Sequence, residues 1–407
     1  NYGIHKTPFN SRYRYTREVD YCSGASLFSK TSILKEVGGL SEYLKPAYFD
    51  DADLAMKVKR SGRKVYFSAK SKVFHLEGVS NGTSVEKGNK SFQKQNEIKF
   101  SKKWGKSFQD RPEPSFAQLD KVAEIFYQKK VLFIDYETPR SNKDAGGFAA
   151  VNEMKMFQSL GYKVDFIPEN IAYFGEATNK LERIGIRCIN HPEVYSLKEY
   201  LQIYGNDYDV IFITRFTVAE SCIDILKGRK NTFYFNNADL HFLREFRSLS
   251  DGTQTDLIKD IRKRELAVIE AADVAFCYTD TERHIIESHI LQKGKVKIMP
   301  WVTEIKVTKP IAKLEGKLGF LGSFHHKPNQ EAVDYIKTVL AKECSDLEFI
   351  VGGFGWKKEK IGNFENIGAI DNLKDFFGEC RALIVPLKAG AGIKGKIFEA
   401  LSYGVPI

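Results

Sequence analysis

Short apolar runs alternate with amphipathic segments over the last two-thirds of the chain. Buried-strand patterns lie at 131–135, 163–167, 209–213 and 232–235, with helical periodicity at 147–160 and 256–272. A second series has strand patterns at 317–321, 347–351 and 382–386 and helical patterns at 329–340 and 394–402. Alternating strands and helices are typical of parallel sheets covered on both faces. The pattern predicts an α/β fold with two facing Rossmann-like domains, 131–310 and 311–407, the second incomplete.

The first third of the chain has a different pattern. Residues 1–82 are rich in Tyr, Ser, Gly and Asp, with strand-like segments at 65–67 and 73–74. Residues 83–130 predict a Lys-rich helical linker, because Phe92, Phe100 and Trp104 recur at multiples of four among seven lysines. We expect one apolar stripe and a lysine-rich outer face. That face is either simply solvated or binds an anionic membrane surface or acceptor.

Composition narrows the class of protein. The chain has 407 residues, 43% hydrophobic and 28% charged, which indicates a globular protein. No apolar run is long enough for a membrane helix, and the six cysteines form no CxxC pair, which argues against a zinc knuckle or a dense disulfide framework. The net charge of +10 favours anionic partners, but the basic residues are dispersed and match no nucleic-acid-binding motif. The first residue, Asn1, and the strand-like end at 404–407 lead us to expect a piece of a longer protein.

An acidic cluster opens a predicted helix in the first region. Asp50, Asp51 and Asp53 lie within four residues, and the helix pattern ends at Gly62. Because neighbouring carboxylates repel, at least one should be hydrogen-bonded, paired with a metal or raised in pKa. A general base needs such an environment, but helix capping explains the cluster equally well.

Polar residues follow the strands of the first Rossmann-like domain. A Gly-Gly pair opens the first helix, where backbone N–H groups can approach a phosphate. The carboxyl ends of parallel strands deliver further polar groups to the cleft between domains. The expected contacts with an acceptor or a phosphate are Gly146, Gly147, Arg215, Asp239, His241 and Arg244.

A glycine-rich loop with two lysines and a carboxylate precedes the last helix. Backbone N–H groups and ammonium groups suit a nucleoside diphosphate, and a carboxylate one turn later suits its ribose hydroxyls. The loop is not a Walker P-loop. The expected donor-binding residues are Gly392, Lys394, Gly395, Lys396 and Glu399, with Ser323 and Lys327 from the turn after the strand at 317–321.

The first 80 residues or so resemble the C-terminal part of a family 2 glycosyltransferase, which has a GT-A fold. The resemblance rests on 20–25 (DYCSGA), 37–40 (VGGL), the acidic cluster, 61–65 and 73–75. It implies inverting transfer with Asp51 as the base and Asp50 in the place of a glutamate. It also implies a divalent cation, Mg or Mn, for the complete GT-A module. His75 would assist that metal, although a single histidine is more often structural.

The chain from residue 131 onward resembles a family 4 glycosyltransferase with the two-domain GT-B fold. The resemblance is most specific in 239–245 (DLHFLRE) and 390–396 (GAGIKGK). It implies retaining transfer from a nucleotide sugar without a required metal. Two positions depart from the family pattern: Ala391 replaces the first of two glutamates eight positions apart, and Ser323 replaces an arginine. Divergent donor binding and lost activity both remain open.

These features together predict a bacterial two-module glycosyltransferase of the hexosyltransferase type. Its donor would be a nucleotide sugar, and its acceptor a growing cell-surface glycan, a polysaccharide or a lipid-linked glycan. We expect a cytoplasmic protein, or one peripheral on the inner face of the cell membrane, with no nucleic-acid partner. The alternatives are a catalytically decayed module that binds sugar nucleotides or glycans, and an epimerase or phosphorylase on the same scaffold.

Overall fold

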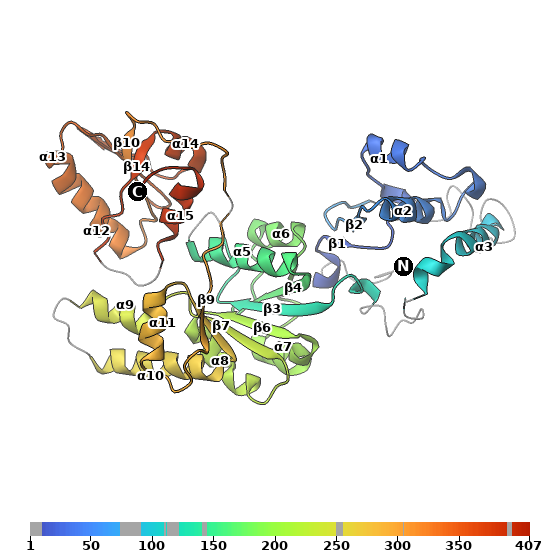
Figure 1. The fold of residues 1–407 in the computed structure, drawn as a ribbon, viewed down its shortest axis with the longest axis horizontal. Helices are drawn as coiled ribbons and strands as arrows, with labels where there is room; N and C mark the ends of the chain where they lie inside the picture. The colour runs from blue at the N-terminus through green and yellow to red at the C-terminus, as the bar shows by residue number, and fades with distance from the viewer. Residues whose placement is uncertain are drawn as a thin grey trace. The chain divides into compact units, whose positions relative to one another are not determined.

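The structure is a computed structural model that describes residues 10–73, 91–109, 111, 122–140, 145–249, 255–303, 305–388 and 393–407 (Figure 1). The contacts within the chain separate two compact units. Unit 1 comprises 1–129, 161–165 and 178–189, and unit 2 comprises 130–160, 166–177 and 190–407. None of the described helices is long and apolar enough to cross a membrane. All six cysteines are free thiols, and four of them are buried.

Unit 1 is built from short helices and strands. Strands β1 (Arg17–Glu18) and β2 (Tyr66–Phe67) pair antiparallel, and the helices are α1 (Thr31–Glu36), α2 (Asp50–Arg60) and α3 (Phe92–Trp104). The predicted helix at the acidic cluster is therefore present as α2, and the strand pattern at 65–67 as β2. The other strand pattern is not, because Val73 has no regular structure and Phe74 lies outside the described residues.

A buried carboxylate joins α2 to α3. Asp53 is fully buried and accepts hydrogen bonds from Ser41 Oγ at 2.6 Å, Tyr43 OH at 2.7 Å and Trp104 Nε1 at 2.8 Å. The ammonium group of Lys103 lies 2.7 Å from the same carboxylate. Although burial alone would raise it, these donors hold the pKa of Asp53 well below its usual range. Of the three acidic residues, Asp53 is thus a structural anchor.

The lysines of α3 are exposed, as the sequence predicts, and two of them also bind groups elsewhere in unit 1. Besides Lys103, which pairs with Asp53, Lys99 donates from Nζ to the carbonyl of Tyr43 at 2.9 Å. The same helix buries Asn96, whose side chain donates to the carbonyl of Leu44 at 2.6 Å. Long lysine side chains can cross the rim of a helix to reach an acceptor, which a period count does not reveal.

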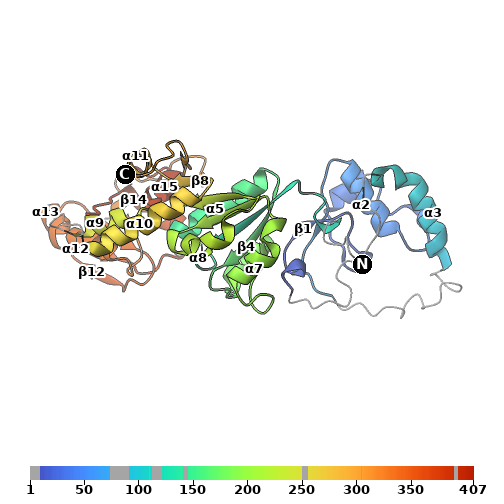
Figure 2. The same cartoon turned by 90° about the horizontal axis from the view of Figure 1, so that it is seen from below.

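The first large sheet has seven strands in the order β5-β4-β3-β6-β7-β8-β9. Its strands are β3 (Lys129–Asp135), β4 (Tyr162–Pro168), β5 (Arg187–Cys188), β6 (Val210–Thr214), β7 (Thr232–Asn236), β8 (Val274–Cys277) and β9 (Val296–Ile298). Its helices are α5 (Ala145–Ser159), α6 (Glu176–Arg183), α7 (Leu197–Tyr204), α8 (Phe216–Leu226), α9 (His241–Ser248), α10 (Asp256–Ala271) and α11 (Asp280–Glu287). Helix α10 packs against α8 and α9 (Figure 1 and Figure 2).

The second sheet of unit 2 has five strands in the order β12-β13-β11-β10-β14. Its strands are β10 (Lys317–Leu321), β11 (Phe349–Gly352), β12 (Glu359–Ile361), β13 (Phe364–Asn366) and β14 (Cys380–Leu383). Its helices are α12 (Lys327–Tyr335), which continues into a π-helical turn at Ile336–Leu340, α13 (Ala341–Glu343), α14 (Leu373–Gly378) and α15 (Gly395–Ser402). Phe320, Phe349 and Phe364 form its buried core.

Most strands of both sheets run parallel, so the predicted α/β fold with parallel sheets is confirmed. Strands β3 and β6 are central and buried, and their apolar residues make them identifiable from sequence. The last predicted strand, 382–386, is displaced: β14 ends at Leu383, and Pro386, which has no N–H to donate, lies beyond the ladder. The pairing of β14 with β10 is also irregular between Lys317 and Leu318.

Candidate active site

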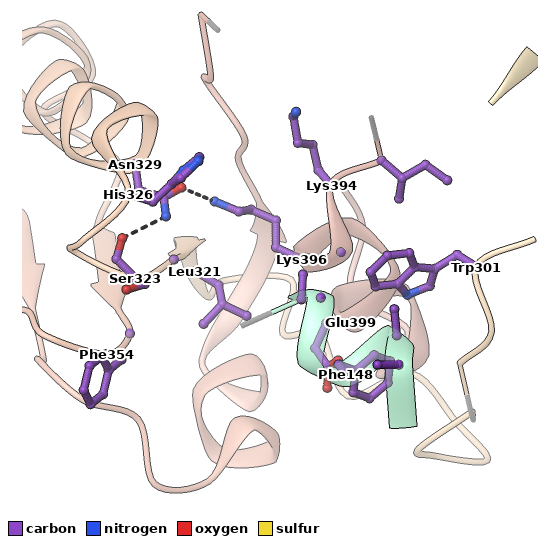
Figure 3. A pocket seen from close by; sticks show the side chains of 18 of the residues that line it. Phe148, Trp301, Leu321, Ser323, His326, Asn329, Phe354, Lys394, Lys396 and Glu399 are labelled. Atoms are coloured by element: carbon purple, nitrogen blue, oxygen red, sulfur yellow. Dashed lines mark hydrogen bonds between the residues drawn. The ribbon is translucent and has the colours of Figure 1, made fainter. Parts of the chain in front are cut away.

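The topology of each sheet in unit 2 marks one position for ligand binding. In the first sheet the chain order reverses between β3 and β6, and in the second between β10 and β14. In open parallel sheets, ligands bind outside the carboxyl ends of the strands at such a switch point. A cavity of about 980 Å³ is lined by residues that follow all four strands (Figure 3). Eight of the predicted site residues line it: Gly146, Arg215, Asp239, Ser323, Lys394, Gly395, Lys396 and Glu399.

One asparagine shapes the cavity wall after β10. The side-chain amide of Asn329 donates to the carbonyl of Ser323 at 2.9 Å, and its side-chain oxygen accepts from Lys396 Nζ at 2.8 Å (Figure 3). A Cβ at position 322 would lie 2.7 Å from the Asn329 carboxamide, so any larger residue there would displace this side chain. The indole N–H of Trp356 donates to the carbonyl of Gly322 at 2.6 Å, which fixes this loop from the other side.

Two lysines at the start of α15 give the cavity a cationic wall. Burial and the neighbouring charge of Lys394 lower the pKa of Lys396 to about 7. Burial likewise lowers the pKa of Lys394, despite the opposing charge of Asp239. The pKa of His326 is lowered by burial and by both lysines. A bound anion would stabilise the protonated forms of Lys394, Lys396 and His326, so this wall is suited to a phosphate group.

Glu399 lies one turn into α15 and also lines the cavity. Burial raises the pKa of its carboxyl group, against the opposing charge of Lys306. Its position after the two lysines is the one predicted for a group that accepts from ribose hydroxyls. The other two loop positions discussed above, Ala391 and Gly392, lie outside the described residues.

The first sheet contributes the opposite wall. Arg215, after β6, donates from Nε to Asp135 Oδ1 at 2.9 Å, which joins the two strands of the switch point. Asp239 accepts from Arg244 Nη1 at 2.8 Å. Gly146 faces the cavity from the start of α5.

Four described residues predicted for the GT-B site, Gly147, His241, Arg244 and Lys327, do not line this cavity. Gly147 is buried in α5, and a Cβ there would lie 2.8 Å from the backbone of Arg140, so the glycine serves close packing. The backbone N–H of His241 donates to the buried Glu265 at 3.0 Å, and Arg244 reaches the site only through Asp239. The side chain of Lys327 is 85% exposed and lies 3.9 Å from Glu331. His75 lies outside the described residues.

Sequence reasoning missed a polar cluster on the first wall. Glu153 of α5 accepts from Tyr278 OH at 2.7 Å and from Asn236 Nδ2 at 3.0 Å, and all three residues line the cavity. Burial raises the pKa of Glu153 to about 7, although Tyr278 and Asn236 oppose the shift. The one available signal was a charged residue on the apolar face of an otherwise regular helix pattern.

Trp301 is a second cavity residue that the sequence did not indicate. Its ring stacks against Phe148 of α5 at 6.4 Å (Figure 3) and against Phe398 of α15 at 6.1 Å. The helices on the two sides of the cavity therefore share one aromatic contact. Trp301 lies in the connecting segment after β9, which has no helix or strand pattern that would have indicated a site residue.

Unit 1 holds the second predicted site at the start of α2. Asp51 accepts hydrogen bonds from the backbone N–H groups of Gly24 and Ala52, both at 2.8 Å, and Asp50 is the first residue of the helix. The preceding residues Tyr48 and Phe49 both have positive φ, so the chain turns sharply into the helix. Among the described residues, no group of three or more His, Cys, Asp or Glu side chains is placed to hold a metal ion.

The family comparison matches the part of the chain that forms the second wall of the cavity. Residues 315–407 match the family model described as Glycosyl transferases group 1. The chain contains a glycosyltransferase domain. This match confirms the predicted enzyme class and nucleotide-sugar glycosyl transfer, and the matched segment includes every donor-side residue described above. No curated protein matches the sequence.

Solved glycosyltransferases share the fold of the two-sheet part. HepE of Anabaena in complex with UDP-glucose is 12% identical, with 69% of this chain and 79% of that chain covered and a TM-score of 0.52. TarM of S. aureus, in a complex that includes UDP, is 9% identical, with 69% and 85% covered and a TM-score of 0.52. Sucrose-phosphate synthase from Thermosynechococcus elongatus is 13% identical, with 69% and 80% covered and a TM-score of 0.50. The predicted GT-B fold of the glycosyltransferase is confirmed.

Proposed function

We propose that unit 2 transfers a hexose from a nucleoside diphosphate sugar to a hydroxyl group of a growing cell-surface glycan. The observation that carries this proposal is the pair of half-buried lysines, Lys394 and Lys396, at the switch point of the second sheet. Their lowered pKa values indicate cations held where charge is unfavourable until an anion binds. HepE and TarM, whose complexes contain UDP, support a uridine nucleotide as the first candidate.

The donor would lie along the second sheet. Lys394, Lys396 and the backbone N–H groups at the start of α15 bind the diphosphate, and Glu399 accepts from the ribose hydroxyls. Ser323 offers a hydroxyl and a backbone N–H in place of the arginine side chain found in relatives. The carbonyl of Ser323 is already fixed by Asn329, so this loop is held in place before the donor arrives.

Transfer breaks the bond between the anomeric carbon and the β-phosphate oxygen and forms a bond to the acceptor oxygen. The diphosphate leaves with the electron pair, and the hydroxyl proton of the acceptor is released. Charge grows on the departing phosphate, so Lys394 and Lys396 stabilise the transition state more than the ground state. The acceptor would approach from the first sheet, past Gly146, Arg215 and Asp239. We propose retaining stereochemistry without a required metal, as the family resemblance implies.

A catalytically decayed binding module is the alternative, and a specific observation favours it. Ser323 and Ala391 replace an arginine and a glutamate of the family pattern. A protein that binds sugar nucleotides without releasing nucleoside diphosphate in the presence of acceptor extracts would fit this alternative.

We propose further that unit 1 carries part of a GT-A glycosyltransferase, with Asp51 as the base of an inverting transfer and Asp50 beside it. The support is the tight turn into α2, which holds the Asp51 carboxylate against the 23–26 loop. Its two oxygens already accept backbone N–H groups, which orients the carboxylate. The Mg or Mn ion expected for the complete module has no ligand set among the described residues, so no step is derived through it.

The outer face of α3 supports the proposal that the protein binds a membrane or a lipid-linked partner. Lys94, Ile98 and Lys102 recur every four residues, and Ile98 is 65% exposed. Such a face can lie on an anionic surface, so the protein would be peripheral on the inner face of the membrane. Cosedimentation with phosphatidylglycerol vesicles at low salt tests this. Equal recovery with neutral vesicles would contradict it.

The decisive experiment is nucleoside diphosphate release by the full chain from a panel of UDP-, GDP- and ADP-sugars, with and without acceptor extracts. We expect one donor to be turned over. Glu399→Gln should abolish that turnover if unit 2 is active, and Asp51→Asn if unit 1 is active. No release from any donor, combined with intact donor binding, would instead establish the binding module.

A further inference from the structure

One face of α5 lines the cavity, and we refer to the part of the cavity along this face as the groove. Gly146, Ala149, Ala150 and Glu153 are spaced three, four and seven residues apart and all line the cavity, so they share one helix face. The three small residues leave space beside the helix. The groove ends at the carboxyl group of Glu153, the only acidic side chain that α5 contributes to the lining.

The carboxyl group of Glu153 is held in one orientation. Tyr278 OH donates to its Oε1 at 2.7 Å, and Asn236 Nδ2 lies 3.0 Å and 3.2 Å from its two oxygens. The orientation of the Asn236 amide is in turn fixed, because its oxygen accepts from the N–H of Ala238 at 3.1 Å. Glu153 is 3% exposed, Tyr278 8% and Asn236 1%.

A buried carboxyl group of this kind lowers the stability of the fold, so its presence points to a functional role. Burying a carboxylate with neutral donors alone destabilises a fold, and a leucine or glutamine would pack here without that cost. Tyr278 donates to Oε1, and Asn236 Nδ2 lies closer to Oε1 than to Oε2, so Oε2 retains capacity to accept another hydrogen bond. A ligand hydroxyl group in the groove would supply that donor.

The groove begins where the donor diphosphate is expected. A Cβ at Gly395, between the two lysines, would lie 2.7 Å from the Cβ of Ala145, so α15 and α5 touch at their first residues. A sugar attached to a diphosphate bound at Lys396 would therefore lie beside the first turns of α5. The hydroxyl groups of that sugar would be the hydrogen-bond donors that the ligand offers on the α5 side of the cavity.

We propose that Glu153 is a specificity-determining residue for the donor sugar, whose carboxylate accepts a hydrogen bond from a hydroxyl group of the hexose. Tyr278 and Asn236 are positioning residues that hold the carboxylate. This inference rests on the proposed function, since it requires a nucleotide sugar in this cavity. It adds a sugar contact from the first sheet to a donor site otherwise built on the second.

Calorimetric titration of the full chain with nucleotides and sugar nucleotides tests the assignment. UDP and GDP are titrated first, followed by UDP-glucose, UDP-galactose, UDP-N-acetylglucosamine and GDP-mannose. For the sugar nucleotide that binds the wild type most tightly, Glu153→Gln should weaken binding about tenfold, the usual effect of losing a hydrogen bond to a charged group. Binding of the free nucleoside diphosphate should not change, which also shows that the variant is folded. Tyr278→Phe should act in the same direction by roughly threefold.

Glu220→Gln is the matched control, because Glu220 pairs with Arg264 on the outer helices and does not line the cavity. It should change neither affinity. Equal losses for the nucleotide and its sugar conjugate in Glu153→Gln, or no loss for either, would overturn the role of Glu153 and leave the proposed function intact. Failure of the wild type to bind any nucleotide would overturn both.

Discussion

The ammonium group of Lys396 and the side-chain oxygen of Asn329 are joined by a hydrogen bond of 2.8 Å that connects α15 to α12. The same lysine lies 4.1 Å above the centre of the Phe320 ring. Neither partner is an anion, so the cation is oriented without being neutralised. The arrangement keeps a lysine ready for an anionic ligand at the cost of a lowered pKa.

Nucleotide binding should depend on pH through this lysine. The pKa of Lys396 is about 7 in the free protein, so the cation predominates below neutrality and is lost as pH rises. A bound diphosphate stabilises the protonated form of Lys396. The affinity for UDP should therefore fall as pH rises from about 6 to about 8, and binding should be accompanied by proton uptake. Calorimetry in buffers of different ionisation enthalpy measures that uptake.

Two variants separate Lys396 from other groups in the cavity. Lys396→Gln should bind UDP roughly tenfold more weakly and should take up fewer protons. Lys388→Gln is the control, since Lys388 is exposed, contacts the Tyr335 ring and does not line the cavity. Proton uptake that persists unchanged in Lys396→Gln would assign the effect to another residue, such as His326.

Gly322→Ala should weaken nucleotide binding without contacting the nucleotide. The added methyl group would lie 2.7 Å from the carboxamide of Asn329, which must move and release Lys396 and the Ser323 carbonyl. We expect about tenfold weaker UDP binding and a loss of about 1–3 kcal/mol of stability, typical of overpacking. Gly378→Ala is the control, because a Cβ there meets no atom within 4 Å. Unchanged UDP affinity in Gly322→Ala would show that Asn329 is not needed to orient the lysine.

The strands and the donor loop were predictable because their signals are local. The apolar runs of β3 and β6 reflect burial on both faces, and the lysines of α15 follow a glycine-rich turn within a few residues. The position of Lys396 at the start of its helix, directly after the glycine-rich loop, already indicated that this lysine lines a ligand site. Its partner Asn329 belongs to a helix far away in sequence, so the hydrogen bond that orients the lysine was not predictable.

The other wall of the cavity depends on long-range assembly. Glu153, Asn236 and Tyr278 come from a helix, a strand end and a loop, and only the order of the sheet brings them together. Sequence spacing favoured His241 and Arg244 instead, because both follow β7 closely. In the structure the backbone N–H of His241 donates to Glu265, and Arg244 donates to Asp239. Polar residues near a strand end are easily identified; which of them face the cavity is decided by packing.

Asp53→Asn should destabilise unit 1. The substitution removes the charge that compensates Lys103 and replaces an acceptor oxygen of Asp53 with an amide that opposes the donors Ser41, Tyr43 and Trp104. The side chain of Lys103 is 35% exposed and stays solvated without its partner, so we expect a loss of about 1–3 kcal/mol, the cost of leaving buried hydrogen-bonding groups unsatisfied. Limited proteolysis of the 40–104 region against denaturant concentration measures the loss. The matched acid-to-amide control is Glu42→Gln, whose side chain is 81% exposed and pairs with Lys45; similar sensitivity of both variants would contradict the anchoring role of Asp53.

The charge on Glu153 should cost stability at neutral and higher pH. Its pKa is raised from 4.5 to about 7, so between these values the folded protein binds more protons than the unfolded chain, and stability falls as pH rises. Above about pH 7 the penalty is constant and amounts to about 3 kcal/mol for the shift given. Glu153→Gln carries no such penalty, because an amide can still accept from Tyr278 and does not ionise.

The melting temperature of Glu153→Gln should therefore equal or fall below that of the wild type at about pH 5 and exceed it at about pH 8. Glu220→Gln should shift the melting temperature by a similar amount at both pH values, because its partner Arg264 is charged throughout. A difference for Glu153→Gln that does not change with pH would mean that the carboxyl group ionises normally. If the variant gains stability at high pH while losing affinity for the sugar nucleotide, the chain retains a destabilising charge because ligand recognition requires it.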